Sequence, residues 1–287
     1  MSVLLSPSQL LAEREAGATI RVLDVRWRLD RPDGRPEYLD GHIPGAVYVD
    51  LDTQLARKGA ATDGRHPLPT VEVLQAAVRS WGIHDGDRVV VYDDWQSAAA
   101  SRAWWLLRYA GLDDVRVLDG GLGEWTAQGN ELESGDVTVE PGTATLSYGH
   151  LPVLDIDDAA GFPATGVLLD ARAPERYRGE TEPLDPRAGH IPGAVNAPSS
   201  GNVDDRGRFL SADQLRERFS ALGVSDDIPV GAYCGSGITA AHHALALTLA
   251  GFEPAVYPGS WSQWSNHPDR SVATGAKAGV PADAPLG

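Results

Sequence analysis

The sequence predicts an α/β protein built from two tandem domains, each containing a mostly parallel sheet flanked by helices. Three observations lead to this prediction. One motif occurs twice, half a chain apart; short β-branched runs alternate with helical patterns in each half; and 287 residues are enough for two domains with separate cores. We expect the first domain at residues 1–140 and the second at residues 150–287.

An internal repeat organises the chain. Residues 41–47 read Gly-His-Ile-Pro-Gly-Ala-Val, and residues 189–195 repeat these letters without a change. Other landmarks follow in the same order in both halves: residues 23–26 match 169–172, residues 91–93 match 232–234, and residues 120–125 match 259–264. The repeat indicates two copies of one domain. We expect the join between Glu131 and Gly166, where Gly, Pro, Thr, Ser and Asp dominate.

The elements of each copy follow from local patterns. Short β-branched runs at residues 20–25, 89–92 and 115–118 predict strands, and the apolar periodicity of residues 71–81 and 97–110 predicts helices. The strand at residues 89–92 is apolar on both faces, which is typical of a parallel sheet covered by helices. Two helix starts carry a hydroxyl cap followed three residues later by Gln, at residues 6–9 and 211–214.

The charge and the cysteine content exclude several classes of protein. Lys and Arg number 24 against 40 Asp and Glu, so the net charge of −16 opposes binding to nucleic acids and to anionic membranes. No apolar run reaches the roughly 18 residues of a membrane span. The single cysteine can form neither a disulfide within the chain nor a multi-thiolate metal site. We therefore expect a cytoplasmic protein without a metal or a cofactor.

The single cysteine, Cys234, lies where a strand is expected to end and a helix to begin. Residues 230–233 predict the strand, residues 234–239 a glycine-rich turn, and residues 240–250 an apolar helix. Glycines in the turn let the backbone curl so that its N–H groups point inward, and the positive end of the helix dipole adds to them. Such a loop favours an anion at its centre. Here the anion would be the Cys234 thiolate, which is a nucleophile.

Other interpretations of this loop are less favourable. A lone cysteine is often a small buried hydrophobe, but the position of Cys234 on a loop argues against that role. The first copy has Asp93 at the matching position, so thiol chemistry cannot occur there. A cysteine-based phosphatase would need an arginine six residues after the cysteine to hold phosphate, and this chain has Ala240 there. Phosphatase and arsenate-reductase chemistry are therefore disfavoured.

The repeated Gly-His-Ile-Pro-Gly-Ala motif and the run Cys-Gly-Ser-Gly-Ile-Thr-Ala, which starts at Cys234, together resemble one family. The chain is similar over nearly its whole length to the two-domain rhodanese-type sulfurtransferases. The resemblance implies two tandem rhodanese-like domains, of which only the second is catalytic. Ser236 stands where the thiosulfate enzymes typically carry a basic residue, so the loop looks like that of the 3-mercaptopyruvate type.

The resemblance also implies roles for residues outside the loop. In the 3-mercaptopyruvate enzymes an Asp and a His of the inactive domain reach the loop serine, and these match Asp52 and His66. Two arginines of the family hold the carboxylate of the donor, and these match Arg176 and Arg187. The loop amides would bind the donor and stabilise a persulfide. The loop residues concerned are Gly235, Gly237, Ile238 and Thr239.

The residues themselves also support an anion site. Four arginines lie close together in an otherwise acidic chain, at Arg172, Arg176, Arg178 and Arg187. Guanidinium forks suit carboxylates, so we expect two of these arginines in the site and the others paired with neighbouring acidic residues. The histidines His42 and His190 occur in both copies of the repeated motif, which assigns them to a turn rather than to chemistry.

The resemblance, together with the cysteine loop, implies a sulfurtransferase that moves a sulfane sulfur from 3-mercaptopyruvate, through a persulfide on Cys234, to a thiol or to cyanide. Ser236, linked to His66 and Asp52, would relay a proton to the pyruvate enolate that leaves. Two alternatives stay open: a thiosulfate:cyanide sulfurtransferase, and a persulfide carrier or regulatory module without turnover of its own. The expected partners are a small anionic sulfur donor and a thiol acceptor, such as a small thiol or a thioredoxin-like protein.

Overall fold

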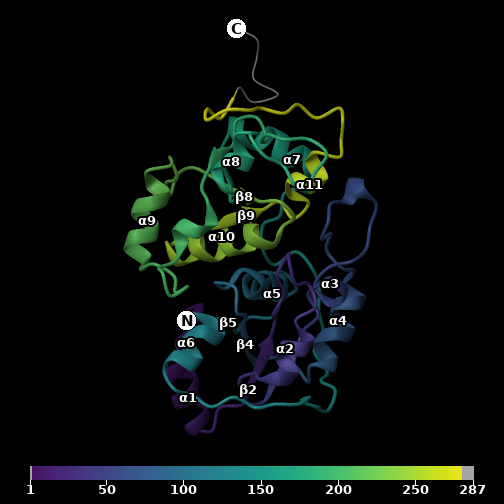
Figure 1. Ribbon diagram of the computed structural model, residues 1–287, viewed down its shortest axis with the longest axis vertical. Helices are drawn as coiled ribbons and strands as arrows, with labels where there is room; N and C mark the ends of the chain where they lie inside the picture. The colour runs from purple at the N-terminus through teal and green to yellow at the C-terminus, as the bar shows by residue number, and fades with distance from the viewer. Residues whose placement is uncertain (1, 280–287) are drawn as a thin grey trace. The chain divides into compact units, whose positions relative to one another are not determined.

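The chain divides into two compact units in a computed structural model that describes residues 2–279. Unit 1 comprises the described residues up to Arg57, together with Leu68–Leu151 and Val203–Phe209. Unit 2 comprises Lys58–Pro67, Pro152–Asn202 and the described residues from Leu210 onward. Each unit therefore contains one short segment from the part of the chain that otherwise builds the other unit. Figure 1 shows the helices arranged around the strands of each unit.

Unit 1 contains a five-stranded sheet with the order β1-β5-β4-β2-β3, in which every pair of neighbours is parallel. Its strands are β1 (Leu4–Leu5), β2 (Ile20–Asp24), β3 (Ala46–Tyr48), β4 (Arg88–Tyr92) and β5 (Val115–Leu118). Its helices are α1 (Pro7–Glu15), α2 (Arg35–Asp40), α3 (Leu51–Gln54), α4 (Val71–Ser80), α5 (Ala98–Tyr109) and α6 (Gly121–Ala127). The strands and helices predicted in this half are confirmed, with only small shifts at their ends.

Unit 2 contains a four-stranded parallel sheet with the order β7-β6-β8-β9. Its strands are β6 (Val167–Asp170), β7 (Val195–Asn196), β8 (Val230–Tyr233) and β9 (Pro254–Val256). Its α-helices are α7 (Ile156–Gly161), α8 (Pro174–Tyr177), α9 (Ala212–Ser220), α10 (Ile238–Leu249) and α11 (Ser260–Trp264). Its 3-10 helices are η1 (Ala61–Asp63), η2 (Phe162–Ala164) and η3 (Ser199–Asn202). A parallel bridge between Val153 and Val256 stands where β1 pairs in unit 1. The predicted α/β class with parallel sheets is confirmed.

Both units carry the same buried polar network beneath the repeated motif. In unit 1, Nη2 of Arg26 donates to the Asp24 carboxylate at 2.7 Å and to the main-chain oxygen of Gly41 at 2.7 Å. The Tyr92 hydroxyl donates to the same carboxylate and accepts from the N–H of Ile43. Matching positions in unit 2 are Asp170, Arg172, Gly189, Tyr233 and Ile191. Because the network is present with and without the cysteine, it serves the fold rather than the chemistry.

The repeated histidines belong to this shared framework. Nδ1 of His42 lies 2.8 Å from the main-chain oxygen of Tyr38, and the two rings stack with centroids 4.1 Å apart. His190 makes the same contact with the main-chain oxygen of Tyr177, at 2.8 Å, with stacked rings 3.7 Å apart. Both histidines are completely buried. Their assignment to a turn is confirmed.

The predicted helix starts are also present. Ser6 and Gln9 form a capping box at the start of α1, and Ser211 and Gln214 form one at the start of α9. The helix after the cysteine loop, α10, begins at Ile238, slightly earlier than its apolar pattern predicts. Among residues 2–279, no helix combines the length and the apolar character that crossing a membrane requires.

Candidate active site

Cys234 follows the central strand β8 directly, and its loop ends where α10 begins. The residue is buried, with 2% of its surface exposed, and its Sγ atom accepts a hydrogen bond from the N–H of Gly237 at 3.1 Å. Gly237 caps α10 with a φ of +83°, a left-handed conformation that glycine adopts without strain. The sulfur therefore lies in a backbone turn at a helix N-terminus, where a negative charge is stabilised. Ligand sites of parallel α/β sheets lie at this carboxyl edge.

The first residues of α11 hold the cysteine loop by hydrogen bonds. Main-chain N–H groups of Trp261 and Ser262 donate to the carbonyl oxygens of Cys234 and Gly235, at 2.9 and 2.8 Å. The N–H of Cys234 donates to Oγ of Ser260 at 3.1 Å, and the same Oγ lies 3.9 Å from Sγ. Ser260 is fully buried and has a φ of +52°, which is unusual for a residue other than glycine. Strained residues of this kind are found where a site requires them.

Sequence reasoning did not single out Ser260. The signal was present in the repeat, because Gly121 of the first copy aligns with Ser260 of the second. Gly121 has a similar φ of +55°, and its neighbour Leu122 donates its N–H to the carbonyl oxygen of Asp93 at 2.9 Å. The backbone conformation is thus common to both units. Only the cysteine-bearing unit adds a hydroxyl group there.

Two guanidinium groups reach the loop at Gly235. A Cβ atom placed on Gly235 would lie 3.0 Å from Nη2 of Arg65 and 3.5 Å from Nη1 of Arg176. Arg176 belongs to α8, and Arg65 follows η1 in the short segment that joins unit 2. The structure brings Arg176 next to the cysteine loop, as the resemblance implies for it. It also adds Arg65, whose one signal in the sequence was its position directly before His66.

Two buried carboxylates hold these guanidinium groups. Glu182 accepts from Nη2 of Arg176 at 2.6 Å, and Asp185 accepts from Nη1 of Arg65 and from Nη2 of Arg176. The side chains of Glu182 and Asp185 are only 3% and 2% exposed, so the arginines supply the partners that buried charges need. Both acids come from the residues after α8, where the second repeat is longer than the first.

Arg187, which the resemblance assigned to the donor carboxylate, is used differently. Its guanidinium group donates four hydrogen bonds of 2.6–2.9 Å to main-chain carbonyl oxygens, those of Trp264, Ser265, His267 and Arg270. A guanidinium group has five N–H donors, and a bidentate contact with a carboxylate needs two. Arg187 therefore holds the chain that follows α11, and the geometry does not support it as a ligand of the donor.

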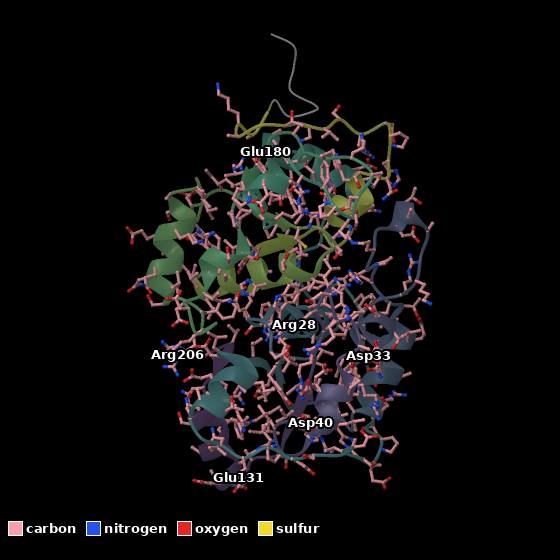
Figure 2. All side chains as sticks on the ribbon, in the orientation of Figure 1. Arg28, Asp33, Asp40, Glu131, Glu180 and Arg206 are labelled. Carbon is pink, nitrogen blue, oxygen red and sulfur yellow. The ribbon has the colours of Figure 1, made fainter. Side chains whose placement is uncertain are left out.

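The other two clustered arginines form ion pairs, as expected. Arg172 is buried against Asp170 at 2.6 Å; burial lowers the pKa of Arg172, but the attraction of Asp170, Tyr233 and Glu182 together outweighs burial and raises it. Arg178 pairs with Glu180 at 2.7 Å on the surface of unit 2. Figure 2 shows Glu180 at the outside of the molecule. These contacts leave Arg176 as the single member of the predicted cluster next to the cysteine loop.

The remaining predicted site residues are divided between the units. Ser236 follows Gly235 in the loop and is 8% exposed, and His66 is half-buried in the segment of unit 2 that contains Arg65. Ile238 and Thr239 form the first turn of α10. Asp52 lies in unit 1, in α3, where its N–H donates to the Asp50 carboxylate at 3.0 Å. The relay through Ser236, His66 and Asp52 stays a prediction.

The matching loop of unit 1 shows what this backbone accommodates. The Asp93 carboxylate, in a residue only 1% exposed, accepts hydrogen bonds of 2.8–2.9 Å from the N–H groups of Trp95, Ser97 and Ala100. Burial raises the pKa of Asp93 to about 6, while these three hydrogen bonds lower it. In the first repeat, a side-chain carboxylate therefore accepts the main-chain N–H groups of the loop. Among the described residues, no cluster of His, Cys, Asp and Glu side chains suited to a metal ion occurs.

Comparison with known proteins agrees with this geometry. The rhodanese-like domain family matches residues 6–128 and 156–267. The chain is 46% identical to SseB of Mycobacterium tuberculosis, which is named for thiosulfate sulfurtransferase activity, over 95% of this chain and 97% of that protein. It is also 46% identical to a Pseudomonas aeruginosa protein named for 3-mercaptopyruvate sulfurtransferase activity, over 96% of this chain and 99% of that protein. The crystal structure of SseA from Escherichia coli, a 3-mercaptopyruvate enzyme, matches with a TM-score of 0.80 and 34% identity, covering 91% of this chain and 99% of that one.

The chain belongs to the rhodanese-like family, with two rhodanese domains in tandem. It is a sulfurtransferase, in line with its relatives, which are named for 3-mercaptopyruvate or thiosulfate as the donor. The predicted family, fold class and enzyme class are confirmed. The choice of donor is a separate matter, because relatives of equal identity carry the two different names.

Proposed function

We propose that this sulfurtransferase takes a sulfur atom from 3-mercaptopyruvate and holds it as a persulfide on Cys234. The thiolate attacks the thiol sulfur of the donor, so that an S–S bond forms and the donor C–S bond breaks. The electron pair of that bond leaves with carbon as pyruvate enolate, which then takes up a proton. A thiol or cyanide next attacks the outer sulfur and releases the Cys234 thiolate. One observation carries the proposal: the single cysteine lies in a turn that donates an N–H to its sulfur, with the Arg176 guanidinium group beside the next residue.

The loop sequence supports 3-mercaptopyruvate as the donor. Ser236 lies in the cysteine loop, and we propose that it passes a proton to the enolate with the help of His66 and Asp52. Arg176 binds the donor carboxylate. The amides of the loop, from Gly235 to Thr239, stabilise the negative charge on the persulfide.

A thiosulfate:cyanide sulfurtransferase is the second candidate. The name of the Mycobacterium tuberculosis relative, which is 46% identical, favours it. With thiosulfate the leaving group is sulfite, which needs no proton from a relay. The activity ratio on the two donors therefore separates the candidates.

Sulfur loading is tested by the intact mass of the purified protein after brief exposure to each donor. We expect wild-type protein to gain one sulfur atom and Cys234→Ser to gain none. Loading at a lower concentration of 3-mercaptopyruvate than of thiosulfate would support the proposed donor, and the reverse order would favour the second candidate. No gain with either donor would refute persulfide chemistry at this cysteine. A carrier without turnover would load once and then show no steady-state rate with small donors.

The proton relay is tested by replacing its histidine. His66→Ala should lower turnover of 3-mercaptopyruvate far more than turnover of thiosulfate, because only the enolate needs a proton. His84→Ala, at an exposed histidine of unit 1, serves as the matched control. Equal losses on the two donors would remove His66 from the relay.

The domain roles form the last part of the proposal. The first repeat, residues 1–140, has Asp93 in place of the cysteine and carries no sulfur, while residues 150–287 form the catalytic domain. A small thiol or a thioredoxin-like protein accepts the sulfur, and the enzyme acts in the cytoplasm, where a thiol stays reduced. Steady-state rates with a small thiol and with a reduced thioredoxin would rank the acceptors.

A further inference from the structure

We propose that Arg187 is a positioning residue for sulfur transfer, which acts on the cysteine loop through α11. This inference rests on the proposed function, because it concerns the loop amides that would stabilise the persulfide. The observation that carries it is a continuous set of hydrogen bonds. Arg187 holds α11 and the residues after it, and α11 holds the main-chain carbonyl groups of Cys234 and Gly235.

The contact between α11 and the cysteine loop fixes the direction of two loop amides. The carbonyl oxygens of Cys234 and Gly235 accept the main-chain N–H groups of Trp261 and Ser262, at 2.9 and 2.8 Å. In a planar trans peptide the N–H group points opposite to the carbonyl oxygen. The N–H groups of Gly235 and Ser236 therefore point away from α11 as long as α11 stays in place. These are two of the amides that we expect to stabilise the persulfide.

Arg187 binds both ends of α11. Its main-chain oxygen accepts the Nε1–H group of Trp261, near the start of the helix, at 2.9 Å. Its guanidinium group donates to the carbonyl oxygens of Trp264 and Ser265, at the end of the helix, at 2.8 and 2.9 Å. Two further bonds, of 2.6 and 2.7 Å, reach main-chain oxygens of the residues that follow. One residue thus determines where the whole of α11 lies.

The indole ring of Trp261 has little freedom to move by itself. Trp261 is completely buried, and the Arg172 guanidinium group lies 4.6 Å from the centre of its ring. Arg172 is held in turn by Asp170, at the end of β6. Closely packed interiors transmit strain. A displacement of Arg187 should therefore move α11, rather than be absorbed by a rotation of the indole ring.

Arg187 and Trp261 have no counterparts in the first repeat, where the matching positions carry Leu39 and Leu122. The main-chain bond to the loop is nevertheless present there, since Leu122 donates its N–H to the carbonyl oxygen of Asp93 at 2.9 Å. The repeat without a nucleophile thus builds the same loop without this side-chain link. Because the fold does not require the link, its presence beside the cysteine points to the chemistry.

The first test compares kcat with KM in Arg187→Lys. Lysine keeps the charge, but its ammonium group cannot reproduce the bonds of a planar guanidinium group. We expect kcat for 3-mercaptopyruvate to fall about tenfold or more and KM to stay unchanged, because misplaced amides weaken the transition state and not the binding of the donor.

Arg216→Lys is the matched control. Arg216 also donates to a main-chain oxygen at the end of a helix of unit 2, that of Ala250 at 3.1 Å. It does so at the end of α10 that lies away from the cysteine loop. Arg216→Lys should therefore leave both kcat and KM unchanged. An equal fall of kcat in Arg187→Lys and Arg216→Lys would overturn the proposal.

Amide hydrogen exchange tests the link itself. The N–H groups of Trp261 and Ser262 should exchange about tenfold faster in Arg187→Lys than in wild type, and at the wild-type rate in Arg216→Lys. A purely structural role of Arg187 would lower the melting temperature and speed this exchange without a change of kcat in the folded protein. That result would also overturn the proposal.

Trp261→Phe keeps the proposal testable if Arg187→Lys does not fold. Phenylalanine retains an aromatic ring in the core but has no N–H group for the main-chain oxygen of Arg187. We again expect kcat to fall and KM to stay unchanged. An unchanged kcat in whichever of the two variants folds would contradict the proposal.

A failure of this inference can be told from a failure of the proposed function. If wild-type protein takes no sulfur from either donor but the exchange of Trp261 and Ser262 depends on Arg187, the link to the loop stands and the proposed function fails. If sulfur loading and turnover occur and neither kcat nor the exchange depends on Arg187, the function stands and this inference fails.

Discussion

Ser260 offers a quantitative test of how the cysteine loop is held. Replacement by Ala removes Oγ, which accepts the N–H of Cys234 at 3.1 Å in a site that is 2% exposed. A buried N–H without an acceptor costs about 1–3 kcal/mol. Ser260→Ala also keeps a side chain at a φ of +52°, where a residue other than glycine is strained by about 1 kcal/mol. Ser260→Gly loses the same hydrogen bond but relieves that strain.

We therefore expect both variants to be less stable than wild type, and Ser260→Ala to be the less stable of the two. The free energy of unfolding of Ser260→Ala should be about 1–3 kcal/mol lower than that of wild type. That of Ser260→Gly should be about 1 kcal/mol higher than that of Ser260→Ala. Urea unfolding gives the free energies, and hydrogen exchange of the peptide around residues 230–240 reports the Cys234 amide directly. The reasoning would be refuted if the Cys234 amide exchanged as slowly in Ser260→Ala as in wild type. It would also be refuted if Ser260→Gly were less stable than Ser260→Ala.

Three further changes test other parts of the structure. Gly121→Ala should destabilise unit 1 by about 2–4 kcal/mol in urea unfolding, because its Cβ would lie 2.3 Å from the carbonyl oxygen of Asp93 at a φ of +55°; a loss below 1 kcal/mol would contradict the crowding seen there. Arg187→Lys should lower the melting temperature of unit 2, because an ammonium group cannot reproduce four hydrogen bonds to carbonyl oxygens, and should leave the KM for 3-mercaptopyruvate unchanged; a large rise in KM would return Arg187 to the donor site. Burial lowers the pKa of His243 well below its ordinary value. The unfolded chain then takes up a proton near pH 6.5 that the folded chain does not. The stability of wild type should therefore fall as the pH drops below about 6.5, by up to about 1.4 kcal/mol per pH unit, and His243→Gln should lose that slope; identical slopes in the two proteins would show that another group titrates.

The sequence predicted the fold well where local patterns determine it. The strands at β2, β4 and β5, the capped helices α1 and α9, and the cysteine turn follow from periodicity and from residues with special backbone preferences. The inclusion of residues 58–67 in unit 2 could not be predicted, because contacts between distant parts of the chain leave no local signal. Arg65 was missed for that reason.

The prediction for Arg187 rests on a different kind of evidence, the spacing of residues in the family. Family spacing placed a second arginine after a Glu-Pro stretch, and the longer loop of this chain moved that position away from the pattern. In the structure the same loop supplies Asp185, which holds Arg65 beside the cysteine turn. Arg65 and Asp185 come from distant parts of the chain. An alignment by spacing follows the sequence and cannot detect this.

The two loops of this chain separate what the fold supplies from what the chemistry needs. Asp93 and Cys234 follow equivalent strands, and each has an acceptor atom that receives main-chain N–H groups at the start of a helix. Both repeats therefore have a loop whose main-chain N–H groups can hold a negatively charged group. In the first repeat the side-chain carboxylate of Asp93 accepts three such N–H groups. In the second repeat the sulfur makes one such bond, and the arginines stand beside it rather than within it. The fold provides a place for negative charge in each domain, and we expect sulfur transfer only in the second, where that charge resides on a nucleophile.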